Sequence, residues 1–312
     1  MPNATSAQTV LITGSTGLVG TALVASLEND GHRVLRAVRP TSRNTKKQAH
    51  APQELSWNPA TGQIERDKLA DVDAVVHLAG ANIAGRRWSK SYKQLLLDSR
   101  TQGTRLISET LASLDNKPRV LVCASAIGYY GARDDTELDE TAPCGEGFLP
   151  ELCMLWERAC QPARDADIRV VNMRIGVVLS PKGGALKKML PPFKLGAGGI
   201  LGTGRQYFSW IALDDVIHAT KFLLNNEAIS GPVNLVAPQP VTNREFTKTL
   251  GSVLSRPTIF PMPTFAARLA FGEMADALLL TGARVSPKVL ADQGYDFLHP
   301  SLEPTLRYLL EK

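Results

Sequence analysis

The sequence of 312 residues has no long hydrophobic run. No apolar stretch approaches the roughly 18–20 residues that a membrane-spanning helix needs. The first residues, MPNATSAQ, lack the charged start and apolar centre of a secretory signal. We therefore expect a cytoplasmic protein with no membrane partner.

Cysteine is scarce and scattered. The four cysteines are Cys123, Cys144, Cys153 and Cys160, and none of them forms a CxxC pair. No histidine stands at zinc-finger spacing from them. This pattern excludes a disulfide framework of the secreted type and gives no metal site. Buried, reduced thiols are the expected state.

A strong excess of one charge is also missing. The net charge is +5 and the isoelectric point is about 9.0. The densest basic stretch runs from Arg36 to Lys47 and is short. Because the excess is small and scattered, we expect no nucleic-acid partner. We expect a small-molecule substrate whose identity the sequence does not specify. A homodimer is compatible with the sequence.

The most informative stretch is VLITGSTGLVG, from Val10 to Gly20. A short apolar run is followed by Gly14, Gly17 and Gly20 at the spacing G-x-x-G-x-x-G, and then by apolar residues at helical spacing. A glycine turn between a strand and a helix lets the backbone approach a pyrophosphate, and the helix N-terminus supplies free N–H groups. The pattern predicts a dinucleotide-binding turn.

The end of the second predicted strand favours NADP(H) over NAD(H). That strand is RVLRAV, Arg33 to Val38, and no acidic residue occurs from Gly31 to Ala51. An acid in this region would hold the ribose 2′-hydroxyl of NAD. Instead, Arg39 and Arg43 follow the strand, and a guanidinium suits a 2′-phosphate. The alternative is that these arginines belong to a solvated loop.

Strand and helix patterns alternate through the first part of the chain. The spacing predicts strands near 54–57, 73–78, 120–123 and 169–174, and a long helix from about 89 to 114. Such alternation is typical of an α/β fold with a doubly wound, Rossmann-type parallel sheet whose ligands lie along one edge. His77 falls inside an apolar strand, where a packed core histidine is expected.

A change in composition near residue 180 suggests two parts. We predict an NADP-binding Rossmann-type domain over 1–180, which strands from the later chain can join, and a smaller substrate-facing lobe over 181–312. Glycine and proline interrupt the start of the second part, as in loops that carry function.

Several motifs together resemble the extended short-chain dehydrogenase/reductase superfamily, and more closely its NAD(P)-dependent epimerase/dehydratase-like branch with a distinct C-terminal extension. They are TGSTGLVG, HLAGANIAGRRW, SRTQGT, SAIGYYG, RIGVVLSPKGGAL, GTGRQYFSWIALDD and GPVNLVAP. The resemblance implies NADP(H) contacts at Gly14, Ser15, Thr16, Gly17, Leu18, Gly20, Arg39, Leu78, Ala79, Arg100 and Val177.

The sequence departs from the superfamily where acid–base chemistry is expected. Active members use Tyr-x-x-x-Lys, in which the lysine lowers the pKa of the tyrosine. In the helix where this pair should lie, Cys153 and Glu157 stand at that spacing. The usual asparagine is Arg100, and the usual serine position falls on Ala126, next to Ser125.

Two hypotheses follow from the departure. In the first, the protein is an NADP(H)-dependent, epimerase-like oxidoreductase that acts on a nucleotide sugar or a small carbonyl compound. Its rearranged donor is Tyr129 or Tyr130, helped by Ser125, with Glu157 as a base. In the second, the protein binds NADPH without turnover and is a regulatory or redox-sensing module.

The segment GTGRQYFSW corresponds in position to the substrate-facing loop of extended relatives. There, Arg205 and Gln206 are candidates to hold a phosphate or sugar hydroxyls, because a guanidinium fork suits a diphosphate. An exposed loop charge at Arg205 is the alternative.

Overall fold

The computed structural model describes residues 7–39 and 53–311. Its centre is an eight-stranded sheet in the order β12-β8-β6-β5-β1-β2-β3-β4, in which every neighbouring pair is parallel except β3 and β4. The strands are β1 (Thr9–Thr13), β2 (Arg33–Val38), β3 (Glu54–Asn58), β4 (Gln63–Ile64), β5 (Ala74–His77), β6 (Val120–Ala126), β8 (Arg169–Ile175) and β12 (Gly231–Leu235). From β1 the strand order proceeds in opposite directions, so the β1/β5 boundary is the switch point at which ligands of such sheets bind.

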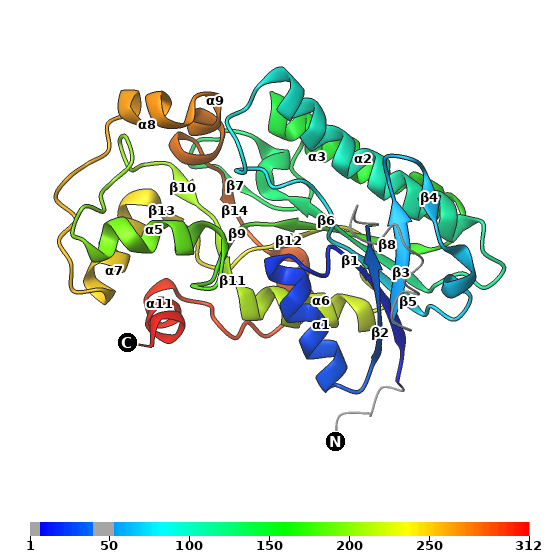
Figure 1. The fold of residues 1–312 in the computed structure, drawn as a ribbon. Coiled ribbons are helices and arrows are strands. Elements are labelled where there is room, and N and C mark those ends of the chain that lie inside the picture. Colours follow the sequence, from blue (N-terminus) through cyan, green and yellow to red (C-terminus); the bar gives the residue numbers. More distant parts are fainter. Residues whose placement is uncertain (1–6, 40–52, 312) are drawn as a thin grey trace, which may run out of the picture.

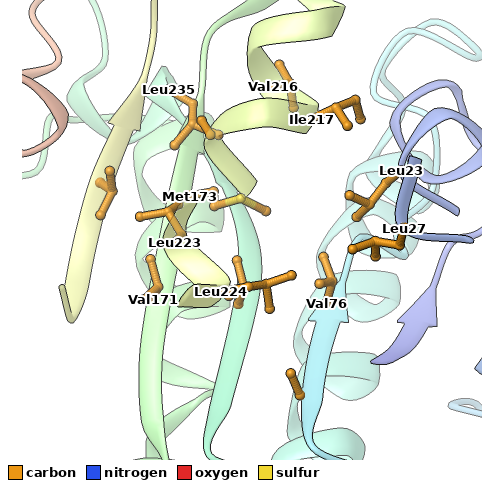
Figure 2. Packing of buried hydrophobic residues seen from close by; sticks show 14 of the residues in the cluster. Leu23, Leu27, Val76, Val171, Met173, Val216, Ile217, Leu223, Leu224 and Leu235 are labelled. Carbon is orange, nitrogen blue, oxygen red and sulfur yellow. The ribbon is translucent and has the colours of Figure 1, made fainter. Parts of the chain in front are cut away.

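Helices cover both faces of the sheet (Figure 1). One face carries α1 (Leu18–Asn29) and α6 (Leu213–Asn225). Figure 2 shows side chains of these helices, such as Leu23 and Ile217, packed near Val76 and Met173 of the strands. The other face carries α2 (Lys90–Ala112), α3 (Phe148–Arg158) and α4 (Gln161–Asp165). Because both faces are buried, the central strands consist mostly of apolar residues.

The later chain builds a second, smaller core. It includes β9 (Val177–Leu179), α5 (Gly184–Lys194), β10 (Tyr207–Phe208), β11 (Trp210–Ala212), β13 (Val241–Thr242), α7 (Asn243–Val253) and α11 (Leu302–Leu310). The segment from α8 (Thr264–Phe271) through α9 (Glu273–Ala275) and the π-helix η4 (Asp276–Leu280) lies beside it (Figure 1). The remaining elements are η2 (Arg66–Leu69), η3 (Ile127–Tyr130), β7 (Glu137–Leu138), β14 (Arg284–Val285) and α10 (Lys288–Asp292).

The doubly wound sheet expected from the sequence is confirmed. β12 and α6 come from beyond residue 180 and complete the main sheet and its cover. The division into 1–180 and 181–312 stays a prediction. Within the described ranges, no helix is both long and apolar enough to cross a bilayer.

Candidate functional site

The glycine turn after β1 is tightly packed. Gly14 has φ +69°, and a Cβ on it would lie 2.9 Å from the carbonyl carbon of Leu78 at the end of β5. A Cβ on Gly20 would lie 2.2 Å from the carbonyl oxygen of Gly14. Only glycine fits at these two positions, because the turn contacts both β5 and the first turn of α1.

The N-terminus of α1 is open to an anion. Gly17 is the N-cap and offers no side chain, and the first turn contains no acidic residue. Within the described chain, the N–H groups of Leu18, Val19 and Gly20 have no acceptor. Unpaired N–H groups and the helix dipole make such an end a phosphate site. These residues therefore fit a dinucleotide pyrophosphate, with Ser15 half-buried and Thr16 exposed beside them.

The end of β2 is followed by a cation, Arg39, that makes no ion pair with any residue the structure describes. Arg39 is exposed and, among the described residues, has no acidic partner. Arg36, three residues earlier, differs because its guanidinium lies 2.7 Å from a carboxylate oxygen of Glu28. Arg43 lies outside the described residues. The contact of Arg39 and Arg43 with a 2′-phosphate stays a prediction.

The end of β5 is tied to β1 through Thr13. Its hydroxyl oxygen accepts hydrogen bonds from the N–H groups of Leu78 and Ala79 at 3.1 and 3.2 Å and lies 2.8 Å from Nδ1 of His77. His77 is fully buried beside the edge of Trp57. Burial lowers the pKa of His77 to about 4. It is therefore a neutral core residue, as expected from its strand.

We predict that His77 makes the fold sensitive to mild acid. An unfolded histidine binds a proton below about pH 6.5, whereas the folded His77 binds one only near pH 4. Stability is therefore complete above pH 6.5 and is lost as the pH falls toward 4, by up to about 3 kcal/mol. Urea unfolding at several pH values should show this loss in the wild type and a smaller one in His77→Gln. Parallel pH curves for the two proteins would contradict the assignment.

A buried polar cluster lies at the carboxyl ends of β6 and β8. Ser125 and Arg174 are register neighbours on these strands, and Glu157 reaches them from α3. Arg174 donates from Nε to Oε1 of Glu157 at 2.9 Å and from Nη2 to Oε2 at 3.0 Å. The Ser125 hydroxyl donates to Oε1 at 2.7 Å. Burial disfavours the charge of Arg174, but its bonds with Glu157 outweigh this and raise its pKa.

Two tyrosines surround the same guanidinium. Tyr130 is fully buried and donates its hydroxyl to Oδ1 of Asn234 at 2.7 Å, while Nη1 of Arg174 donates to the Tyr130 oxygen at 3.1 Å. Burial raises the pKa of Tyr130 to about 12, although Arg174 opposes the shift. Tyr129 is half-buried, and the guanidinium carbon lies 3.5 Å from its ring centroid.

The structure thus brings together all four predicted catalytic candidates, Ser125, Tyr129, Tyr130 and Glu157. It also restricts what two of them can do. The Glu157 carboxylate is engaged by three donated bonds, and the Tyr130 hydroxyl is engaged by Asn234 and Arg174.

Sequence reasoning missed Arg174 and Asn234. A signal for Arg174 was present, because an arginine inside the apolar strand VVNMRI needs a buried acidic partner.

The helix pair at the usual Tyr-x-x-x-Lys position is not chemically equivalent to it. Cys153 is buried, and burial raises the pKa of its thiol to about 12, so it remains protonated at neutral pH. The spacing itself does occur at Tyr308 and Lys312. Tyr308 is exposed on α11, where its ring packs on His299, and Lys312 lies outside the described residues.

The remaining predicted residues lie apart from this cluster. Val177 opens β9 and pairs with Trp210. Arg205 is exposed, and Gln206 donates its amide to the carbonyls of Leu201 and Leu279, which links its loop to η4. The described residues hold no group of three metal-ligating side chains. Substrate contacts at Arg205 and Gln206 stay predictions.

Comparison with known proteins identifies the family. A model of the NAD dependent epimerase/dehydratase family matches residues 10–235. The chain belongs to that family. A second model, a domain of unknown function (DUF1731), matches residues 262–309. The recognised resemblance, including the distinct C-terminal extension, is thereby confirmed.

Similar proteins match this chain over nearly its whole length. An epimerase family protein of Mycobacterium bovis is 47% identical over 299 residues, 96% of each chain. The chloroplastic epimerase family protein SDR39U1 homolog of Arabidopsis thaliana is 36% identical, over 98% of this chain and 88% of that one. The crystal structure of human epimerase family protein SDR39U1 with NADPH has a TM-score of 0.86 at 33% identity and covers 97% of this chain and 99% of that one.

Proposed function

We propose that this protein is an NADPH-dependent oxidoreductase that reduces a small carbonyl compound or a nucleotide sugar. The observation that carries the proposal is the open N-terminus of α1, where three N–H groups have no acceptor in the described part of the chain, beside a glycine turn that admits no side chain. The similar human structure contains NADPH. Arg39, which follows β2 and has no acidic partner among the described residues, supports the same cofactor for this chain.

The residues of this chain would hold the cofactor and position the substrate. Gly17 and the first turn of α1 would bind the pyrophosphate, and Leu78 and Ala79 would lie along the nicotinamide half. When bound, NADPH supplies a hydride. The reduced carbonyl oxygen needs a proton, and we propose that Tyr129 donates it, since Tyr129 is half-buried whereas the Tyr130 hydroxyl is engaged. Ser125 and Arg174 would position Tyr129.

A single-turnover experiment tests the proposal. Protein saturated with NADPH is mixed with aldehydes, ketones, oxo acids and nucleotide sugars, and emission of the reduced nicotinamide is followed. Decay with one class supports an oxidoreductase, and Tyr129→Phe should then slow the decay without changing the NADPH Kd. Failure of the wild type to bind NADPH would overturn the proposal.

We predict that Arg39→Ala weakens NADPH binding by about tenfold to a hundredfold, because one charge-assisted contact with the 2′-phosphate is lost. The Kd for NADH should not change, since NADH has no such phosphate. Fluorescence titration with both nucleotides measures the two values. Arg105→Ala is the matched control, because Arg105 is an exposed arginine on α2 that pairs with Glu109. If Arg39→Ala raised the Kd values of NADPH and NADH by the same factor, the 2′-phosphate contact would be wrong.

One observation favours a second candidate, an NADPH-binding regulatory protein without turnover. Glu157 and Cys153 occupy the usual lysine and tyrosine positions, and neither offers a free cation or an acidic hydroxyl. Tight NADPH binding with no decay across the whole substrate panel would support this candidate.

A further inference from the structure

Arg100 is a buried cation that forms no ion pair with any of the residues 7–39 and 53–311. It lies on α2 with 9% of its surface exposed, and its guanidinium carbon is 5.0 Å from the centroid of the Trp156 ring. Its single hydrogen bond within the described chain runs from Nη1 to the carbonyl of Leu96, at 3.1 Å. No carboxylate of the described residues pairs with it, and arginine keeps its proton even when buried. Burying such a charge is costly unless something pairs with it.

The unused edge of this guanidinium is the one that binds planar anions. Nε is buried and has no partner, and Nη2 makes no hydrogen bond within the described chain. The N–H groups of Nε and Nη2 are parallel, so together they can donate to both oxygens of a carboxylate or phosphate. Two adjacent N–H groups that lack acceptors in the described chain indicate that a ligand binds there.

The guanidinium of Arg100 lies just beyond the end of β5, next to Gly80. A Cβ on Gly80 would lie 3.4 Å from Cγ and Cζ and 3.5 Å from Nη1 of Arg100, and Gly80 itself is exposed. The proposed pyrophosphate site at Gly17 follows β1, and β2, which Arg39 follows, lies on the far side of β1 from β5. A cofactor that places its 2′-phosphate at Arg39 directs its nicotinamide toward β5 and β6.

A second observation is the charge of the loop that follows Gly80. Arg86 and Arg87 are exposed and, within the described chain, have no acidic partner. Lys188 of α5 reaches the carbonyl of Ala84 in this loop. Clustered charge of one sign at a cleft raises the local concentration of ions of the opposite sign. The loop therefore favours an anionic ligand.

We propose that Arg100 binds a carboxylate or phosphate group of the substrate, so that the substrate is a small anionic carbonyl compound such as an oxo acid. This rests on the proposed function and assigns Arg100 to the substrate, whereas the family resemblance assigns it to the cofactor. Gly80, which is exposed and has no side chain, lies against Cζ and Nη1 of this guanidinium. The loop with Arg86 and Arg87 attracts the anion from solvent.

Calorimetric titration with three probes tests the proposal, with and without NADPH. Oxalate is a planar dicarboxylate, inorganic phosphate is the alternative anion, and oxamide is the neutral analogue of oxalate. We expect wild-type protein to bind one of the two anions at least about tenfold more tightly than oxamide. The tighter anion identifies the group. Arg100→Gln should lose this binding by about tenfold or more and keep the wild-type Kd for NADPH.

Two further variants keep the test decisive if Arg100→Gln unfolds. Arg100→Lys retains the positive charge but not the two parallel N–H donors, so we expect a folded protein with at least about threefold weaker anion binding. Arg105→Gln, on the exposed side of the same helix, should bind as the wild type does. Absence of anion binding by the wild type, or unchanged binding in Arg100→Lys, overturns the proposal. Loss of NADPH binding in the wild type overturns the proposed function instead, because anion binding is also measured without cofactor.

Discussion

Gly20→Ala is expected to weaken NADPH binding by about a hundredfold, equivalent to about 2.7 kcal/mol. The added Cβ would lie 2.2 Å from the carbonyl oxygen of Gly14 and 2.9 Å from Cα of Ser15. Both contacts are with backbone, so the turn itself must move away from α1. The proposed pyrophosphate site consists of this turn and the N–H groups of the helix, so moving the turn would separate the two groups that bind the pyrophosphate. Fluorescence titration measures the Kd, and thermal unfolding should also show a loss of about 1–3 kcal/mol.

Gly103→Ala is the matched control for this effect. Gly103 lies inside α2, and a Cβ there would be 3.5 Å from the Trp57 ring, which is an ordinary contact. Alanine favours a helix over glycine by up to about 1 kcal/mol, so this variant should keep its NADPH affinity and lose no stability. If Gly20→Ala binds NADPH with wild-type affinity, the glycine turn is not the pyrophosphate site.

The cofactor half of the site could be predicted because its signals are local. The three glycines, the helix that follows and the absence of acidic residues after β2 all lie within one strand–helix–strand unit. Turn conformation and helix start depend on neighbouring residues, so a short stretch is sufficient. The structure adds what spacing cannot give, which is that Gly14 also packs against Leu78 from β5.

The polar cluster could not be predicted because its contacts are distant in the sequence. The sequence places Glu157 at the usual lysine position and offers it as a base, but it does not show its partner Arg174, which lies 17 residues later on β8. Asn234 lies 104 residues from Tyr130 and reaches it because β12 adds to the edge of the sheet beside β8. Strand order and register decide these contacts, and neither is encoded in local periodicity.

Arg174→Met is expected to destabilise the fold by about 3–5 kcal/mol. The side chains of Arg174 and Glu157 have exposed fractions of 4% and 13%. Removing one partner of a buried ion pair leaves the other charge without compensation, and this costs more than the pair itself contributes. Glu157→Gln should also destabilise, since it leaves the guanidinium unpaired. Urea unfolding measures both losses, with an unchanged m-value showing that the unfolded states are comparable.

The double variant Glu157→Leu/Arg174→Met measures how much of the lost stability comes from the interaction between the two side chains. It removes both charges, so its loss should be smaller than the sum of the two single losses. Arg307→Met is the exposed control, because Arg307 and Glu303 form a helical pair with exposed fractions of 46% and 53%. That pair should contribute no more than about 0.5 kcal/mol. A loss in Arg174→Met as small as in this control would show that Glu157 is compensated by other groups, and Glu157 would then regain its candidacy as a base.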